Sequence, residues 1–304
     1  MDPSLRQIIL GCGNFGGIGS APQFFGQGES EAEAFAIMDA AWSMGIAAFD
    51  TADAYGGGRS ETWIGRWRAA TGNEPELTTK VFHSVEGVAG DCGLARKRIL
   101  RQIEGSLQRL GVESVDMYLT HEPDPDTPLE ETLGALEELV SAGKVRGIGA
   151  SNVDRAWLEQ AGGRVQLVQN SYSLLDRGSE DVGVYCAEHA LAFTAFSPLA
   201  GGWLAGRYRR GRPPPRGSRM TMRPEPYRHL DDEAVYEGLD RFEAAAGERG
   251  VDMPTLAIAW LLGDPRVTAV VVGPRRPEHL EPARAALDLE LSPAERDELA
   301  SFFP

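Results

Sequence analysis

Lysine is scarce in this 304-residue chain. Of its 30 positively charged side chains, only Lys80, Lys97 and Lys144 are lysines, and the other 27 are arginines. An ammonium is a compact point charge, whereas a guanidinium is large, planar and permanently charged. A chain that uses arginine almost everywhere therefore has a specific need at some of the positions where it keeps lysine.

Cysteine and long apolar runs are also scarce. Cys12, Cys92 and Cys186 are odd in number, far apart and outside any CxxC pair, so neither a disulfide framework nor a zinc knuckle is indicated, and no metal site is expected. No run approaches the ~20 apolar residues of a membrane span, and the first residues do not read as a signal peptide. We expect a cytoplasmic protein with no membrane partner.

The charge balance argues against one large class of partners. With 45 acidic side chains the formal net charge is −15, which repels nucleic acid unless a local basic patch overrides it. The 42 % apolar content is that of a globular protein that can bury a large core. These values argue against a disordered chain and against a nucleic-acid partner.

Short apolar runs alternate along the chain with segments of helical period. Ser30 and Glu33 have the spacing of a capping box and predict the start of the first long helix. Alternating strands and helices indicate a parallel sheet wrapped by helices, and eight units in ~250–300 residues favour a closed (β/α)₈ TIM barrel, here a single domain spanning 1–304. The predicted strands are 8–13, 46–50, 77–81, 115–121, 147–151, 167–171, 193–197 and 268–273.

One segment, 200–231, breaks this alternation. It holds five prolines and many arginines and has no clear period. Long connections in compact domains are usually functional loops or disordered. A basic loop is compatible with nucleic-acid binding, but this one lies on an acidic protein and lacks interleaved stacking aromatics, so we expect a lid loop over the C-terminal face of the barrel.

Four reactive side chains fall at or just after predicted strand ends: Asp50, Tyr55, Lys80 and His121. In a barrel these ends meet at one face, where active sites lie. Taken singly, such an aspartate is commonly a turn cap and such a tyrosine a packing residue. Asp50 and Lys80, however, lie in otherwise apolar strands, where a charge needs a partner, and they can satisfy each other.

This combination of groups suits an acid that donates a proton to a carbonyl oxygen. A phenol titrates near ~10, and a neighbouring ammonium favours its ionised form, so we expect Lys80 to lower the pKa of Tyr55. Asp50 would hold the ammonium, and the His121 imidazole would hydrogen-bond the substrate oxygen or relay a proton. Such a site suits hydride addition to an aldehyde or ketone.

Six segments, in order and at family-like spacing, resemble the aldo-keto reductases. This resemblance implies a (β/α)₈ barrel that reduces carbonyls with NADPH, with Tyr55 as general acid, Lys80 and Asp50 as its supporting pair and His121 as the orienting imidazole. The segments are GIAAFDTADAYGGGRSE (45–61), TTK (78–80), VDMYLTHEPD (115–124), GKVRGIGASN (143–152), VQNSYSLLDR (168–177) and AFSPLAGGWLAGRY (195–208).

The resemblance also implies a cofactor site. Three groups of residues would hold the carboxamide, the nicotinamide ring with the pyrophosphate, and the 2′-phosphate, and two arginines at a helix start suit the last of these. His279 and Ala283 replace a frequent Gln and Asn, so the adenine is expected to be held more loosely or by Arg284. The carboxamide would be held by Ser151, Asn152 and Gln169. The nicotinamide ring and the pyrophosphate would be held by Phe196, Ser197, Leu199 and Gly201. The 2′-phosphate would be held by Gly273, Arg275, Arg276 and His279.

Substrate contacts are expected from the loops at the barrel mouth, although loop packing explains each residue singly about as well. Together these residues predict a largely apolar pocket for an aromatic or aliphatic carbonyl. The main candidates are Phe15, Phe82, Glu122 and Trp203, with Phe24, Phe25, His83 and Tyr172 as further ones.

Three other functions fit parts of the pattern. An NADP(H)-binding, redox-sensing regulatory subunit with slow turnover keeps the cofactor site, a Schiff-base aldolase uses Lys80 alone, and a glycosidase uses Asp50 with Glu122. An aldolase would not use the residues assigned to the cofactor. A glycosidase would not use Tyr55 or Lys80. We expect an NADPH-dependent carbonyl reductase that is a monomer or weak homo-oligomer.

Overall fold

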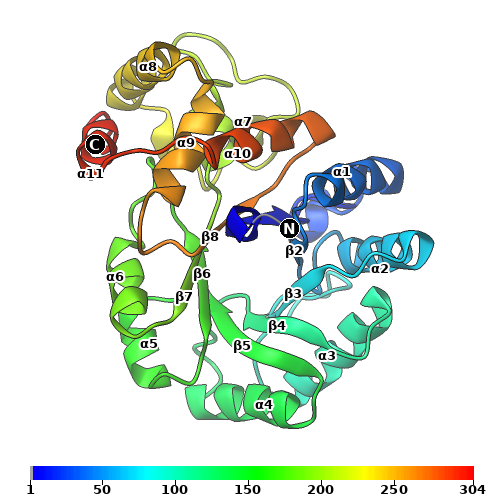
Figure 1. Cartoon of the computed structure of the whole chain (residues 1–304). Coiled ribbons are helices and arrows are strands. Elements are labelled where there is room, and N and C mark those ends of the chain that lie inside the picture. Colours follow the sequence, from blue (N-terminus) through cyan, green and yellow to red (C-terminus); the bar gives the residue numbers. More distant parts are fainter. Residues whose placement is uncertain (1–2) are drawn as a thin grey trace.

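The computed structural model describes residues 3–304 and shows a closed barrel of eight parallel strands in sequential order (Figure 1). β1 pairs with β2 and with β8, which closes the barrel. All eight predicted strands are present, with ends that differ by a few residues. They are β1 (Ile8–Gly11), β2 (Ala48–Asp50), β3 (Glu76–Val81), β4 (Val115–Thr120), β5 (Val145–Ser151), β6 (Leu167–Ser171), β7 (Ala192–Phe196) and β8 (Ala269–Val272).

Helices follow the strands and cover the outside of the barrel (Figure 1). Ser30 and Glu33 form the capping box predicted for α1, and the Asp252 side chain caps α9. The helices are α1 (Glu31–Ser43), α2 (Arg59–Thr71), α3 (Arg96–Leu110), α4 (Leu129–Ser141), α5 (Arg155–Ala161), α6 (Glu180–Glu188), α8 (Glu233–Glu248), α9 (Met253–Leu262), α10 (Glu281–Ala286) and α11 (Pro293–Ala300).

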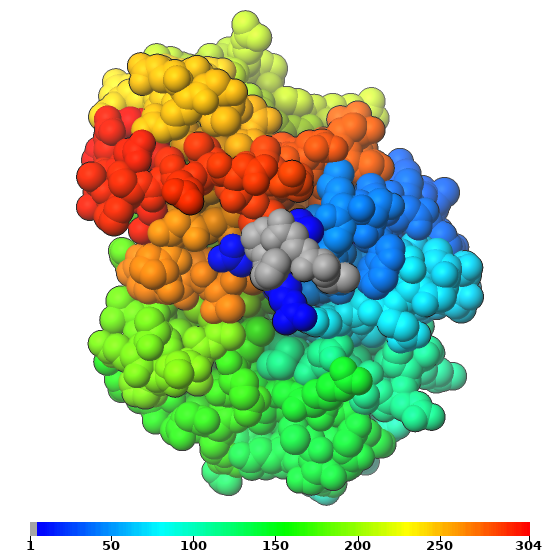
Figure 2. All heavy atoms as spheres, in the orientation of Figure 1, coloured from blue at the N-terminus to red at the C-terminus, as the bar shows by residue number. Residues whose placement is uncertain are grey.

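Short helical pieces fill the connections. η1 (Pro3–Gln7) precedes β1, η2 (Pro22–Phe24) lies in the loop before α1, and η5 (Pro277–Leu280) leads into α10. η5 packs against α1, so the segment after β8 lies beside the first long helix (Figure 2). No helix in the 3–304 range has the length and apolar character needed to cross a membrane.

The 200–231 segment contains more structure than its sequence indicates. It includes η3 (Ala200–Ala205), α7 (Arg219–Met222) and η4 (Arg228–Leu230). It is tied to the barrel by two arginines, since Arg275 Nη1 donates to the Gly217 carbonyl and Arg219 donates to the Asn14 side chain. The segment therefore rests on the loop that follows β1.

Candidate active site

The parallel order places the carboxyl ends of all eight strands at one face, where the four predicted reactive side chains meet. The Tyr55 hydroxyl lies 3.4 Å from His121 Nε2. Lys80 Nζ lies 2.6 Å from Asp50 Oδ1 and 5.2 Å from the centre of the Tyr55 ring. Tyr55, contributed by the loop between β2 and α2, thus lies between an imidazole and a buried ion pair.

The ion pair is almost fully enclosed, with side-chain exposures of 1 % for Lys80 and 5 % for Asp50. Lys80 also donates to the Thr51 carbonyl at 2.9 Å, and Gln169 Nε2 donates to Asp50 Oδ2 at 2.8 Å. Burial lowers the pKa of Lys80, but the charge of Asp50 and the nearby Tyr55 outweigh it, so the pKa lies above its ordinary value. Lys80 therefore remains an ammonium at neutral pH.

The pKa of Tyr55 corrects the expectation that Lys80 lowers it overall. Burial raises this pKa, the Lys80 charge opposes the rise, and the net pKa lies above the ordinary value near 10. Burial, followed by the charge of Lys80, holds the pKa of His121 well below its usual range. At neutral pH the site therefore holds a protonated phenol beside a neutral imidazole.

Glycines let the loop after β1 approach Tyr55 closely. A Cβ on Gly13 would lie 3.5 Å from the Tyr55 ring, and a Cβ on Gly56 would lie 2.4 Å from the Phe15 carbonyl oxygen. Gly56, Gly57 and Gly58 all have positive φ, between 59° and 81°. A side chain at Gly56 would push these two loops apart.

Strained backbone marks the ends of β5 and β7. Asn152, Ser197 and Ala200 have φ of 59°, 60° and 45°, which side chains other than glycine rarely adopt. Two of them, Asn152 and Ser197, were assigned to the cofactor from the sequence. Asn152 Nδ2 also donates to the His121 carbonyl at 2.9 Å, which ties this strand end to the reactive cluster.

A polar pocket of about 280 Å³ lies beyond the end of β8. Arg275, Arg276 and His279, three of the residues assigned to the 2′-phosphate end, line it together with Arg207. Glu29 and Glu33 also line it, and Arg275 Nε donates to Glu29 Oε1 at 2.8 Å. The pocket presents three guanidiniums and therefore suits an anion.

Comparisons with known proteins show the family of this chain. The model of the aldo/keto reductase family matches residues 7–303. The chain belongs to the aldo/keto reductase family. It is thus an oxidoreductase that acts on carbonyl groups.

Three relatives illustrate the range of this family. The chain is 34 % identical over 275 residues to L-glyceraldehyde 3-phosphate reductase of Escherichia coli, a match that covers 83 % of this chain and 78 % of that protein. It is 32 % identical over 288 residues to a probable voltage-gated potassium channel subunit beta of Oryza sativa, covering 87 % and 85 %. The glycerol dehydrogenase structure of Gluconobacter oxydans matches with a TM-score of 0.83 at 25 % identity, covering 97 % and 90 %.

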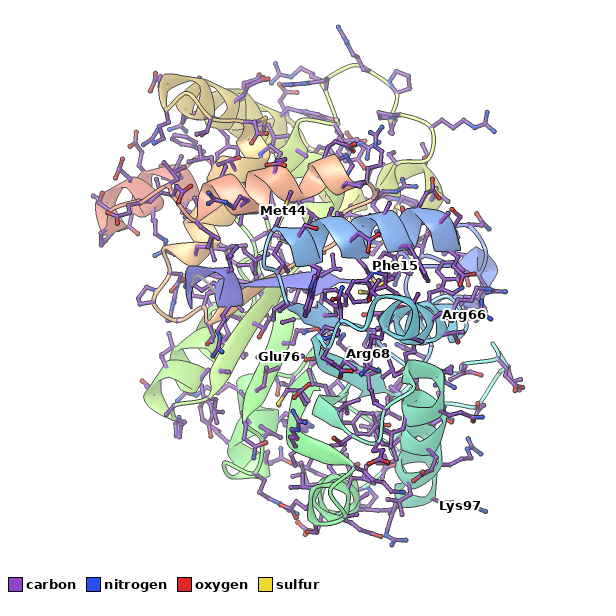
Figure 3. All side chains as sticks on the ribbon, turned by 45° about the vertical axis from the view of Figure 1, so that its right-hand side comes forward. Phe15, Met44, Arg66, Arg68, Glu76 and Lys97 are labelled. Atoms are coloured by element: carbon purple, nitrogen blue, oxygen red, sulfur yellow. The ribbon has the colours of Figure 1, made fainter. Side chains whose placement is uncertain are left out.

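Three of the aromatic residues that were predicted to contact the substrate of this aldo/keto reductase are buried. Trp203 is 1 % exposed and packs against Tyr208 and Tyr236, and Tyr172 is 2 % exposed and donates to Asp264. Phe15 is fully buried in the core near α1 (Figure 3). These three side chains are packed among other residues of the chain, and their contact with substrate stays a prediction.

The remaining candidates line a mixed rim. Phe82 and Glu122 are partly exposed, and His83 Nε2 lies 3.2 Å from Glu122 Oε1. The His83 ring lies 4.9 Å from the His121 ring, centre to centre. The rim beside His121 therefore carries the polar pair of His83 and Glu122 next to the apolar Phe82. Phe24 and Phe25 are also partly exposed, in the loop after β1.

At the adenine end, Ala283 is fully buried in α10, so it offers nothing to the pocket. Arg284, the expected substitute, lies 2.9 Å from Asp288. The reading of the sequence missed Arg207 and Glu29 in this pocket. Arg207 stands in the family-like segment 195–208 and could have been noticed there, whereas Glu29 is far from Arg275 in the chain and carries no local signal.

The buried carboxyl group of Asp53, in the loop between β2 and α2, leads to a prediction about the pH dependence of stability. Burial and the charge of Glu61 raise its pKa to about 8, against the opposing charges of Arg109 and Arg98. The pKa of Asp53 is higher in the folded protein than in the unfolded chain, where it is ~3.9, so Asp53 favours the folded state at low pH. This contribution to the free energy of unfolding is lost as the pH rises toward 8, by at most ~1.4 kcal/mol per pH unit. We expect Asp53→Asn to flatten the pH dependence of the free energy of unfolding.

Urea unfolding of both proteins at pH 5 and pH 8.5 measures this effect. The matched control is Asp297→Asn, since Asp297 is exposed on α11. The control should keep the wild-type difference between the two pH values. An unchanged difference in Asp53→Asn would show that Asp53 is ionised in the folded protein.

Proposed function

We propose that this aldo/keto reductase reduces an aldehyde or ketone to the alcohol with NADPH, and that Tyr55 donates the proton. Bound NADPH would supply a hydride to the carbonyl carbon. The observation that carries the proposal is the Tyr55 hydroxyl, 3.4 Å from His121 Nε2 and backed by the Lys80–Asp50 pair. Phenol and imidazole can both reach one carbonyl oxygen placed between them.

The electrostatics fit a proton donor. The raised pKa of Tyr55 keeps the proton on the phenol until the carbonyl oxygen gains negative charge. The Lys80 ammonium then stabilises the phenolate that remains, and Asp50 and the Thr51 carbonyl hold the ammonium in place before the reaction. Neutral His121 orients the oxygen without adding a charge that would compete with Tyr55.

The residues at the strand ends fit the proposed cofactor. Gln169 uses its NH₂ group on Asp50, which leaves its carbonyl oxygen for a carboxamide, together with the side chains of Ser151 and Asn152. Phe196, at the end of β7, is partly exposed and can offer a ring face to the nicotinamide. Ser197, Leu199 and Gly201 would hold the pyrophosphate, and the pocket beyond β8 would hold the 2′-phosphate, with Gly273 at its edge.

The experiment is NADPH oxidation followed at 340 nm with 4-nitrobenzaldehyde, methylglyoxal and 9,10-phenanthrenequinone, compared with NADH. We expect turnover of at least one carbonyl, with a preference for NADPH. NADPH binding without oxidation on the whole panel would contradict the proposal.

Arg276 gives a test of the phosphate pocket. Its side chain forms no ion pair with any residue in the described range, whereas Arg275 is engaged by Glu29 and Gly217. We expect Arg276→Ser to raise the Kd for NADPH about tenfold and to leave the Kd for NADH unchanged, because a single charge-assisted bond contributes about 1.4 kcal/mol. Quenching of tryptophan fluorescence measures both constants without turnover.

Arg66→Ser is the matched control, since Arg66 is an exposed arginine on α2 that pairs with Glu31 (Figure 3). Its affinity for either nucleotide should equal that of the wild type. If Arg276→Ser weakened the binding of NADPH and of NADH equally, Arg276 would not contact the 2′-phosphate.

A second candidate function is an NADP(H)-binding regulatory subunit with slow turnover. The similarity to the rice protein named a probable potassium channel subunit beta favours it. The presence of all four reactive side chains in one cluster argues for chemistry instead. Tight NADPH binding without turnover, combined with co-purification with a membrane protein, would support the regulatory function.

A further inference from the structure

Arg223 lies at the end of the short helix α7, within the 200–231 segment. A Cβ on Gly19 would lie 3.4 Å from Arg223 Nη1. Gly19 is hydrogen-bonded to both loops that border Tyr55, since its N–H donates to the Gly13 carbonyl at 2.7 Å and its carbonyl accepts from the Gly56 N–H at 3.1 Å. The guanidinium therefore lies against the loops that frame the catalytic phenol.

The Arg223 side chain has no partner within residues 3–304, either as an ion pair or as a hydrogen-bond donor, and it is exposed. Three other arginines of the segment are engaged. Arg209 pairs with Glu243, Arg210 with Glu233, and Arg219 donates to Asn14. Arg223 is thus a guanidinium free to bind a ligand, next to the reactive cluster.

The positive charge of Arg223 affects the pKa values of two groups at the mouth, His121 and Glu122. Burial and Lys80 lower the pKa of His121, and Arg223 adds to that effect. The bond from His83 lowers the pKa of Glu122, and Arg223 adds to that as well. Glu122 itself is engaged by His83, at 3.2 Å, and not by Arg223.

We propose that Arg223 binds an anionic group of the substrate, so that this reductase prefers carbonyl compounds that carry a carboxylate or a phosphate. A guanidinium binds either group through two parallel hydrogen bonds. The carbonyl would lie between Tyr55 and His121 while the anion reaches the rim. This inference rests on the proposed carbonyl reduction and revises the largely apolar pocket expected from the sequence.

The position of Arg223 separates its role from that of the cofactor arginines. Arg275, one of the residues assigned to the 2′-phosphate, follows β8 and donates to Glu29 and Gly217, whereas Arg219 donates to Asn14 in the loop after β1. Arg223 lies against Gly19 and shares none of the contacts that hold Arg219 and Arg275. An effect on substrate without an effect on cofactor is therefore the signature to test.

The first experiment compares Arg223→Gln with wild type on matched pairs of substrates. The carboxylate arm is 4-carboxybenzaldehyde against 4-nitrobenzaldehyde, and the phosphate arm is glyceraldehyde 3-phosphate against glyceraldehyde. We expect the KM of the anionic member of at least one pair to rise about tenfold, with kcat, the KM of the neutral member and the Kd for NADPH unchanged. The arm that responds identifies the anion.

The control is Arg212→Gln, an exposed arginine of the same segment, and it should behave as wild type. Equal changes for anionic and neutral substrates, no change in either arm, or a weaker Kd for NADPH would each overturn the inference.

A second experiment needs no turnover. Calorimetric titration of the NADP⁺-loaded protein with terephthalate and with inorganic phosphate should show about tenfold weaker binding of one of them in Arg223→Gln. Wild-type affinity for both in the variant overturns the anion site even when carbonyl reduction is established. Weakened binding in a protein that reduces no carbonyl supports the anion site and contradicts the proposed function alone.

Discussion

Replacing Tyr55 by phenylalanine is expected to lower kcat for carbonyl reduction by about 10³-fold, within the range of a lost general acid. The substitution removes one oxygen atom and keeps the ring that packs against Gly13 and the edge of His121. Folding and NADPH affinity should therefore persist. Steady-state kinetics with fluorescence titration of NADPH separates the chemical step from binding.

The matched control is Tyr236→Phe on α8, which removes a hydroxyl that donates to Asp231. It should keep wild-type kcat. If Tyr55→Phe also kept it, another group would be the proton donor, and the role assigned to Tyr55 would be lost.

The pH dependence follows from the same site. Reduction needs the protonated phenol, and the pKa of Tyr55 lies above its ordinary value near 10. The rate of the chemical step should therefore stay level from pH 6 to 9 and fall only above the raised pKa, whereas oxidation of the alcohol, which needs the phenolate, should rise with pH. Stopped-flow traces in both directions measure this, and a fall in reduction near pH 7 would indicate a different acid.

Lys80→Arg is expected to abolish most activity, by about 10²-fold or more, although it keeps the positive charge. Lys80 Nζ is enclosed between Asp50 Oδ1 at 2.6 Å and the Thr51 carbonyl at 2.9 Å. A guanidinium is larger than the space that an ammonium fills there, and overpacking a buried site costs ~1–3 kcal/mol and shifts its neighbours. The displaced neighbour that matters for the reaction is Tyr55.

Lys97→Arg is the control, because Lys97 is exposed on α3 and points away from the barrel (Figure 3). Its activity should equal that of the wild type. Thermal unfolding of both variants shows whether the fold survives, and Lys80→Met, which is close to lysine in size but uncharged, separates size from charge. Equal activity of Lys80→Arg and Lys97→Arg would contradict the role of Lys80.

The structure changes the reason why lysine is needed at position 80. The scarcity of lysine directed attention to this residue because an ammonium, unlike a guanidinium, is compact and can lose its charge. Its pKa is in fact raised, because Asp50 and Tyr55 together outweigh burial. The requirement is for a small, permanent cation that fits between Asp50 and Tyr55.

Much of the architecture was predictable from local patterns. The eight strands follow from apolar runs separated by helical segments, and the start of α1 follows from the Ser30 and Glu33 capping box. The convergence of Asp50, Lys80 and His121 follows from their places at strand ends, because parallel strands bring those ends to one face. These features depend on spacing along the chain, which the sequence states directly.

Exposure and pairing across the chain were not predictable in this way. In the sequence, Trp203 and Phe15 resemble the aromatic residues that line a binding mouth, and only the structure shows that both are buried. Arg223 is one of many arginines in its segment, and only the fold leaves it unpaired beside the site while Arg209 and Arg219 find partners.

The sequence by itself thus determined the barrel, its order of strands and the four reactive side chains that meet at one face of it. The tertiary structure alone decided the net direction of the Tyr55 pKa, the burial of Trp203, and the Glu29 and Arg275 contact between residues far apart in the chain. The physical reason is that desolvation and charge pairing depend on which groups surround an atom in space. Those neighbours come from distant segments, and their distances exist only once the barrel has closed.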